Sequence, residues 1–190
     1  MSLRIIAGTW RGRKLAVPAG DATRPTADRT RETLFSMLVS RLGSFEGLKV
    51  ADLFAGSGAL GLEALSRGAE SCLFVDSDAH AARTIRANVA SLGAQAQADI
   101  RACSAMTLGV AKAPLDLVLL DPPYASGAGD VALDKLARLG WIGEATWVSV
   151  ETGLKEEPQV RGFEAVAERK VGKARITLLR LAAPEQSPPD

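Results

Sequence analysis

The sequence has few of the residues on which several protein classes depend. Its 190 residues include two cysteines and one histidine. Cys72 and Cys103 are too few for a disulfide framework and lack metal-site spacing, so we expect buried, reduced thiols. The single histidine, His80, leaves a Ser-His-Asp hydrolase without its usual base, and we interpret it as a solvated helix residue. We therefore expect neither a metal site nor hydrolase chemistry of this kind.

Long apolar runs are also missing. No run approaches the ~18 residues that would span a membrane. The N-terminal MSLRIIAGTWRGRKL lacks the apolar stretch and small-residue cleavage site of a secretory signal. The chain is nevertheless 47% hydrophobic and long enough to bury a real core. These features predict a soluble cytoplasmic protein with one main domain and no membrane partner.

The charge is small in total but unevenly distributed. The net charge is +1, yet residues 1–31 hold seven basic and two acidic side chains, a local charge of +5, which leaves −4 for the remainder. Guanidinium groups suit phosphates, and Trp10 among them can stack on an unpaired base. On composition alone, a solvated face remains an alternative to nucleic-acid binding.

Strand-like and helix-like segments alternate from Leu48 onward. This pattern predicts a mostly parallel sheet covered on both faces, with an antiparallel edge near the C-terminus. A small hairpin, Leu3–Ala7 with Lys14–Val17, is expected before it, and a disordered tail after it, over 183–190. Asp28 is a candidate cap for the first helix. The expected strands are Leu48–Phe54, Ser71–Val75, Ala98–Cys103, Leu115–Leu120, Thr146–Glu151, Phe163–Val171 and Arg175–Leu181. The expected helices are Thr30–Leu42, Ala59–Arg67, Asp78–Leu92 and Val131–Leu139.

A glycine-rich turn joins the first of these strands to a helix. Gly56, Gly58 and Gly61 form a G-x-G-x-x-G pattern, and Asp76 ends the next strand. Glycines let the backbone approach a ligand closely, and an acid at that place can hold ribose hydroxyls. Asp52, four residues before Gly56, would oppose a diphosphate but suit a cation. S-adenosylmethionine (SAM) suits this arrangement, because it offers a sulfonium and an ammonium to a carboxylate and a ribose to Asp76.

The tetrapeptide Asp121-Pro122-Pro123-Tyr124 directly follows another predicted strand. An exocyclic amino nitrogen is a poor nucleophile, because its lone pair is delocalised into the ring. The Asp121 carboxylate and a backbone carbonyl can accept its two N–H bonds and orient it. Two prolines stiffen the turn, and the tyrosine can stack on a flipped base. An ordinary strand-to-loop turn with a surface tyrosine is the alternative for this motif.

These motifs resemble those of class I methyltransferases. Asp-Leu-Phe-Ala-Gly-Ser-Gly (52–58) resembles their first motif, Phe-Val-Asp-Ser-Asp (74–78) their second, and D-P-P-Y the signature of amino-directed N-methyltransferases. The resemblance implies a Rossmann-like fold with a seven-stranded sheet. It implies catalytic roles for Asp121, Pro122 and Tyr124. It implies cofactor contacts from Thr26, Asp52, Phe54, Gly56, Gly58, Asp76, Ser77, Ser104 and Asp121, with Ser104 near the adenine.

The N-terminal segments narrow the resemblance further. R-I-I-x-G-x-W-R-G-R-K-L and R-P-T-x-D-R-x-R-E-x-L-F, followed by the two motifs, are similar to the bacterial small-subunit ribosomal RNA guanine-N2 methyltransferase family. That resemblance implies SAM-dependent methylation of guanine 966 of 16S rRNA, on the 30S subunit or its assembly intermediates. It implies an RNA-binding arm (1–27), a methyltransferase domain (28–182) and a monomer. The RNA-contacting residues would be Arg4, Trp10, Arg11, Arg13, Lys14, Arg24 and Arg29.

Other functions stay open at this point. D-P-P-Y also serves adenine-N6 and DNA amino-methyltransferases, although 190 residues leave no room for a separate target-recognition domain. The glycine pattern alone would also fit an NAD-dependent oxidoreductase. A non-catalytic RNA-binding assembly factor with the same fold is a third alternative. Glu63 is as compatible with a structural role on its helix as with a role in the site.

Overall fold

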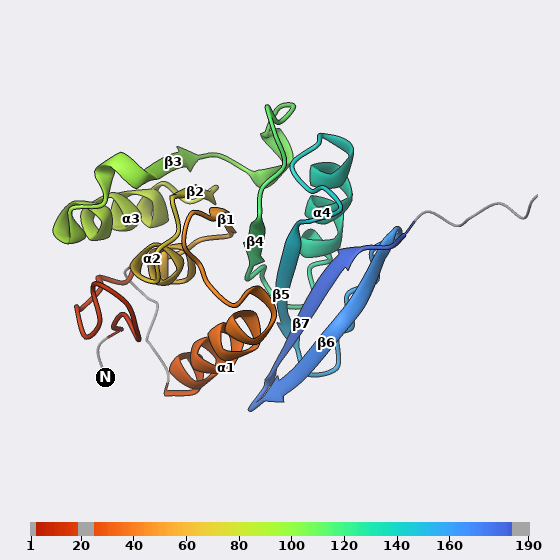
Figure 1. Cartoon of the computed structure of the whole chain (residues 1–190), viewed down its shortest axis with the longest axis horizontal. Coiled ribbons are helices and arrows are strands. Elements are labelled where there is room, and N and C mark those ends of the chain that lie inside the picture. The colour runs from red at the N-terminus through yellow and green to blue at the C-terminus, as the bar shows by residue number, and fades with distance from the viewer. Residues whose placement is uncertain (1–2, 19–24, 184–190) are drawn as a thin grey trace, which may run out of the picture.

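The computed structural model describes residues 3–18 and 25–183, with side chains in the second stretch from residue 28 onward. Seven strands form one sheet in the order β3-β2-β1-β4-β5-β7-β6 (Figure 1). This confirms the predicted number of strands. The strands are β1 (Lys49–Leu53), β2 (Ser71–Asp76), β3 (Ala98–Ala102), β4 (Leu117–Leu120), β5 (Trp147–Gly153), β6 (Phe163–Val171) and β7 (Ala174–Leu181).

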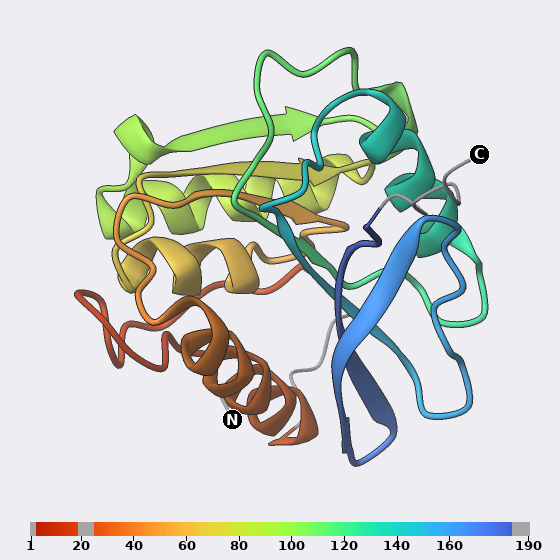
Figure 2. The same ribbon diagram turned by 45° about the vertical axis from the view of Figure 1, so that its right-hand side comes forward.

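The sheet is mixed, and its antiparallel strand does not lie at the edge. Strands β1 to β5 pair in parallel, whereas β7 is antiparallel to both β5 and β6. The expected antiparallel edge strand is therefore wrong by one position: the antiparallel strand, β7, lies between β5 and the edge strand β6. The sequence of β7 explains this, because its apolar residues are buried over most of its length while β6 is largely exposed. Figure 2 shows the two strands as a long ribbon beside the rest of the sheet.

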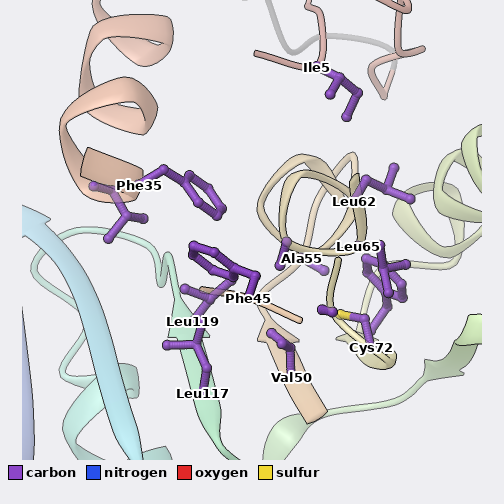
Figure 3. Close-up of a cluster of buried hydrophobic side chains, with 14 of the residues drawn as sticks. Ile5, Phe35, Phe45, Val50, Ala55, Leu62, Leu65, Cys72, Leu117 and Leu119 are labelled. Carbon is purple, nitrogen blue, oxygen red and sulfur yellow. The ribbon is translucent and has the colours of Figure 1, made fainter. Parts of the chain in front are cut away.

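Four helices cover the two faces of the sheet. They are α1 (Pro25–Leu42), α2 (Ala59–Ser66), α3 (Ala79–Leu92) and α4 (Ala128–Arg138). Helices α1, α2 and α3 pack on one face, and α4 packs on the other together with a short 3₁₀ helix, η2 (Ala105–Thr107) (Figures 1 and 2). A second 3₁₀ helix, η1 (Gln95–Gln97), precedes β3. Figure 3 shows part of the first core, where Phe35 of α1 lies beside Phe45 on the side of Leu117 and Leu119 of β4. Leu62 lies on the opposite side of α2. The expected strand–helix alternation thus buries a continuous core on each face.

Two helices begin earlier than predicted. Helix α1 begins at Pro25 instead of Thr30, so Asp28 lies in its first turn rather than capping it. Proline is favoured at a first helical position because its missing N–H would have no helical partner there. The Asp28 carboxylate accepts from Arg31 at 3.1 Å. Helix α4 begins at Ala128, three residues before the predicted start, after Gly127 in a left-handed conformation. The predicted ends of α3 are confirmed, with Asp78 as its N-cap and Gly93 as its C-cap.

The predicted N-terminal hairpin is not formed as a strand pair. Residues 3–18 make one isolated bridge, Arg4 with Lys14, and a few backbone bonds such as Ile5 N to Arg13 O at 3.0 Å. Other N–H groups of this segment bond to α2 instead, which is why no ladder extends. Leu3, Ile5 and Leu15 are buried in the first core cluster. The segment is therefore packed onto the body of the protein.

One predicted feature falls almost wholly outside the described residues. The expected disordered tail lies outside the described residues except for Ala183. Of the helices within residues 25–183, none is long and apolar enough to cross a membrane.

Candidate active site

The glycine turn and the tetrapeptide leave the sheet side by side. Strands β1 and β4 are adjacent and parallel, with Leu53 opposite Leu120. Asp121 N donates to Leu53 O at 3.4 Å, which ties the starts of the two loops together. From β1 the chain proceeds outward through β2 and β3, and then returns to build β4 and β5 on the other side. Sheets of this kind bind ligands outside the carboxyl ends of their strands, where the strand order reverses.

The three glycines of the turn have different surroundings. Gly56 (φ +55°) has open space where a side chain would begin, because nothing lies within 4 Å of an added Cβ. Gly58 (φ +76°) has its space bounded at 3.3 Å by Ile85 and Phe74. At Gly61 an added Cβ would lie 2.4 Å from Phe74 Cε1. The first glycine therefore leaves room for a ligand, and the third allows α2 to pack closely on β2.

Asp76 connects the end of β2 to the glycine turn. Its Oδ2 accepts from Gly56 N and its Oδ1 from Asp78 N, both at 2.8 Å. Each carboxylate oxygen has two lone pairs, so both can accept a further hydrogen bond from a ligand. Its neighbour Ser77 is exposed. The predicted ribose acid thus lies beside the open glycine.

Asp52 lies beneath the turn. It is 1% exposed, and its Oδ2 accepts from Gly61 N at 2.8 Å. Burial raises the pKa of this carboxyl well above its ordinary value, the negative charges of Asp121 and Asp76 raise it further, and the Gly61 N–H opposes them. Asp121 and Asp76 therefore lie close enough to disfavour the charged form of Asp52, and a cation nearby would favour it.

Two residues beside the site have left-handed backbone conformations without being glycine. Phe54 (φ +59°) directly precedes the glycine turn, and Ala125 (φ +57°) directly follows the tetrapeptide. Such conformations cost about 1 kcal/mol or more and persist where the surroundings enforce them. Both loops are therefore held in shapes that their sequences do not favour.

Tyr124 is held by a residue of the neighbouring strand. Its hydroxyl donates to Glu151 Oε1 at 2.9 Å, while half of the side chain is exposed. Burial and the adjacent Glu151 raise the pKa of the tyrosine, and burial raises the pKa of Glu151. Next to the tyrosine, Ala125 N donates to Glu156 Oε1 at 2.8 Å. Asp121 itself is exposed at the rim of the site.

Ser104, predicted near the adenine, caps η2. Its Oγ accepts from Met106 N at 3.2 Å, and the residue is half-buried after β3. Two other predicted residues cannot be placed: Arg24 and the side chain of Thr26 lie outside the described part of the chain.

Three of the predicted RNA-binding residues, Trp10, Arg11 and Arg13, lie apart from the tetrapeptide. Arg13 donates to Ser91 O in the last turn of α3, and Trp10 N donates to Ser66 Oγ at the end of α2. Helix α3 begins at the edge that carries the site and runs away from it for 14 residues, or about 21 Å. The far ends of α2 and α3 thus carry this part of the basic segment, including the exposed Arg11. Arg4, Lys14 and Arg29 are also exposed.

The sequence left the role of Glu63 open and gave no prediction for Asn88, and both have structural roles. Glu63 is fully buried and accepts from Ile6 N (2.7 Å), Ala7 N (3.0 Å) and Arg67 Nε (2.8 Å), which settles its role as structural. Asn88 bonds both Ala16 and Ser57 O, and so joins the N-terminal segment to the glycine turn.

Two glutamates beside the tetrapeptide were not predicted at all. Glu151 lies near the carboxyl end of β5, the strand next to β4. An acid at that position could have been found by applying the carboxyl-end rule to every strand. Glu156 carried no such signal, because it lies in a loop.

Within residues 3–18 and 25–183, no group of three or more His, Cys, Asp or Glu is placed to hold a metal ion.

Known proteins share both the sequence and the fold of this chain. The family model described as "Conserved hypothetical protein 95" matches residues 3–180. Ribosomal RNA small subunit methyltransferase D of Escherichia coli (strain K12) is 37% identical over 153 residues, which are 80% of this chain and 76% of the relative. The protein of the same name from Haemophilus influenzae is 38% identical, over 83% of this chain and 82% of its own length.

A solved structure agrees with these relatives. It is titled as the putative methyltransferase yhhF from Escherichia coli, is 35% identical, has a TM-score of 0.83, and covers 97% of this chain and 100% of its own. The chain therefore has the α/β fold of class I methyltransferases, and it belongs to the conserved hypothetical protein 95 family, to whose model nearly its whole length matches.

Proposed function

We propose that this chain transfers the methyl group of SAM to the exocyclic N2 of guanine 966 in 16S rRNA. The observation that carries the proposal is the meeting of two motifs at one edge of the sheet. The glycine turn after β1 and Asp-Pro-Pro-Tyr after β4 begin one hydrogen bond apart, at Leu53 and Asp121. A cofactor held by the first would have its reactive end beside the second. The named function of the ribosomal RNA relatives supports the choice of substrate.

The residues present fit SAM. The open space at Gly56, bordered by Asp76, can accept a ribose whose hydroxyls bond the carboxylate. The carboxyl groups of Asp76 and Asp121, with Asp52 beneath them, suit a sulfonium and an ammonium better than a pyrophosphate, which argues against a dinucleotide cofactor. When bound, SAM supplies an electrophilic methyl group on a positively charged sulfur. Phe54, Gly58, Ser77, Ser104 and Thr26 complete the proposed cofactor site.

The substrate end of the site requires a base that has left its stack. In our proposal the Asp121 carboxylate and the Pro122 carbonyl accept the two N–H bonds of the guanine amino group, which directs its nitrogen at the methyl carbon. Bound SAM would supply the methyl group in line with this nitrogen and keep the electron pair of the broken carbon–sulfur bond on sulfur, and Asp121 would accept the amino proton that leaves. The half-exposed ring of Tyr124 stacks on the base. Positioning then contributes most of the catalysis.

The basic residues of the N-terminal segment are the proposed RNA contacts. They are Arg4, Trp10, Arg11, Arg13, Lys14, Arg24 and Arg29. Because Arg11 and Arg13 lie near the far ends of α2 and α3, an RNA that reached both them and Tyr124 would extend along this face of the protein. We propose that a monomer binds the 30S subunit or its assembly intermediates, with residues 1–27 as the RNA-binding part, 28–182 as the methyltransferase domain and 183–190 as a disordered tail.

An Asp121→Ala variant tests the proposed chemistry. With 30S particles from a strain that lacks the enzyme, the wild type is expected to incorporate label from methyl-labelled SAM and the variant to lose it, while both bind S-adenosylhomocysteine in calorimetry. Glu164→Ala, an exposed glutamate on β6, is the matched control. An Asp121→Ala variant that methylates at the wild-type rate would show that the tetrapeptide is not the site.

A further inference from the structure

Glu151 is the hydrogen-bond partner of the Tyr124 hydroxyl. It belongs to β5, which pairs in parallel with β4, the strand that leads into the tetrapeptide. The 2.9 Å hydrogen bond between Tyr124 Oη and Glu151 Oε1 joins residues 27 positions apart. Glu151 is half-buried whereas Tyr124 is half-exposed, so the strand residue is the fixed partner and the loop residue is the one being held.

A cavity lies beside the tetrapeptide turn. It measures about 290 Å³, and its lining includes Pro122, Pro123 and Ala125 of the turn together with Glu151 and Glu156. Across this space the turn is held by two hydrogen bonds, Tyr124 to Glu151 and Ala125 N to Glu156.

The segment that supplies these glutamates is itself anchored. Arg175 of β7 is 5% exposed, donates to Leu154 O at 3.2 Å and pairs with Glu157 at 2.8 Å. Thr152 Oγ1 donates to Glu156 O at 2.9 Å, which closes the turn after β5. The tetrapeptide, of which Pro122 is buried and the other three residues are exposed, is thus bonded to a segment that has its own anchors.

We propose that Glu151 is a positioning residue for methyl transfer, which orders the ring of Tyr124 before the target base arrives. This inference rests on the proposed function, in which that ring stacks on the flipped guanine. A free tyrosine would lose its side-chain freedom only when the base bound, and that cost would weaken the reacting complex. A tyrosine already held by Glu151 has lost this side-chain freedom on folding, so the base binds without that entropy loss.

Four variants test the inference: Glu151→Ala, Glu151→Gln, Tyr124→Phe and the double variant Tyr124→Phe/Glu151→Ala. Ordering one side chain corresponds to a factor of about 3 to 10. We expect kcat on 30S particles to fall by that factor in Glu151→Ala and in Tyr124→Phe, with KM for the particles nearly unchanged, because phosphate contacts dominate affinity. The double variant should lose no more than either single variant, since each removes the same bond. Glu151→Gln keeps an acceptor and should stay within about twofold of the wild type.

The chain contains a single tyrosine, so ¹³C-labelled tyrosine reports on Tyr124 alone by NMR. The ring should be ordered in the wild type and in Glu151→Gln, and mobile in Glu151→Ala. This measurement needs no substrate and no activity. Unchanged affinity for S-adenosylhomocysteine confirms that each variant is folded, and Glu164→Ala controls for loss of an acidic side chain.

The inference is overturned if the ring is equally ordered in Glu151→Ala, if the two single losses multiply in the double variant, or if Glu151→Gln is as impaired as Glu151→Ala. A wild-type chain that does not methylate 30S particles would instead overturn the proposed function, and the NMR comparison would still show whether Glu151 orders the ring.

Discussion

Replacing Gly61 by alanine tests how closely α2 packs on β2. The added Cβ would lie 2.4 Å from Phe74 Cε1 and 2.5 Å from Cys72 Sγ, whereas carbon atoms in contact prefer about 3.5–4.0 Å. Phe74 is fully buried and Cys72 is 1% exposed, so neither side chain can swing away. Helix and strand must therefore separate by about 1 Å.

The expected loss of stability follows from two opposing terms. Overpacking of a core costs about 1–3 kcal/mol, and two close contacts place this site at the upper end. Alanine is favoured over glycine inside a helix by about 1 kcal/mol, which offsets part of the cost. We expect a net loss of about 2 kcal/mol, which lowers the unfolding temperature by about 4–8 °C for a domain of this size.

Gly56→Ala is the matched comparison. Its added Cβ meets nothing within 4 Å, so the cost is that of a positive φ, about 1–2 kcal/mol. Its methyl group would occupy the space proposed for the cofactor. Thermal unfolding and calorimetry with S-adenosylhomocysteine separate the two variants: Gly61→Ala should lose more stability, and Gly56→Ala more affinity. Wild-type stability in Gly61→Ala, or wild-type affinity in Gly56→Ala, would refute this division of roles.

Three further predictions concern charge. Burial raises the pKa of Asp52, so its ionised carboxylate destabilises the fold. The contribution of Asp52 to the free energy of unfolding is therefore most favourable below its unfolded pKa near 4, and it falls as the pH rises through its folded pKa. Asp52→Asn should therefore gain stability over the wild type as pH rises from about 4, as urea unfolding at several pH values would show, and equal pH profiles would contradict this. Glu63→Ala leaves the partly buried guanidinium of Arg67 and two N–H groups without their partner and should cost about 3 kcal/mol in urea unfolding, unlike the exposed Glu70→Ala. Arg11→Ala with Arg13→Ala should weaken RNA binding and reduce its salt slope by up to about 2, with cofactor affinity intact; loss of both affinities would indicate a folding defect instead.

The sequence predicted the parts of the fold that depend on local pattern. The alternation of strand-like and helix-like segments predicted seven strands, and the predicted helix Asp78–Leu92 agrees with α3 at both ends. The location of the site could also be predicted, because the glycine turn and the tetrapeptide each follow a buried strand. Their meeting at one edge follows once β1 and β4 are neighbours.

The features that the sequence predicted wrongly or not at all depend on contacts between distant parts of the chain. The N-terminal segment looked like a hairpin, but Glu63 of α2 takes two of its N–H groups, and no periodicity in residues 3–18 could report that. The order of β6 and β7 depends on which strand is the more buried. Glu151 acts on Tyr124 through strand pairing across 27 residues, which a linear motif does not contain.

The central claim is tested most directly by mapping the modified nucleotide. Purified wild-type protein, methyl-labelled SAM and 30S particles from a strain that lacks the enzyme are combined, and the labelled rRNA is digested and sequenced. The account predicts N2-methylguanosine at guanine 966, and no label with Asp121→Ala. Label on an adenine N6, or none from the wild type, would contradict it.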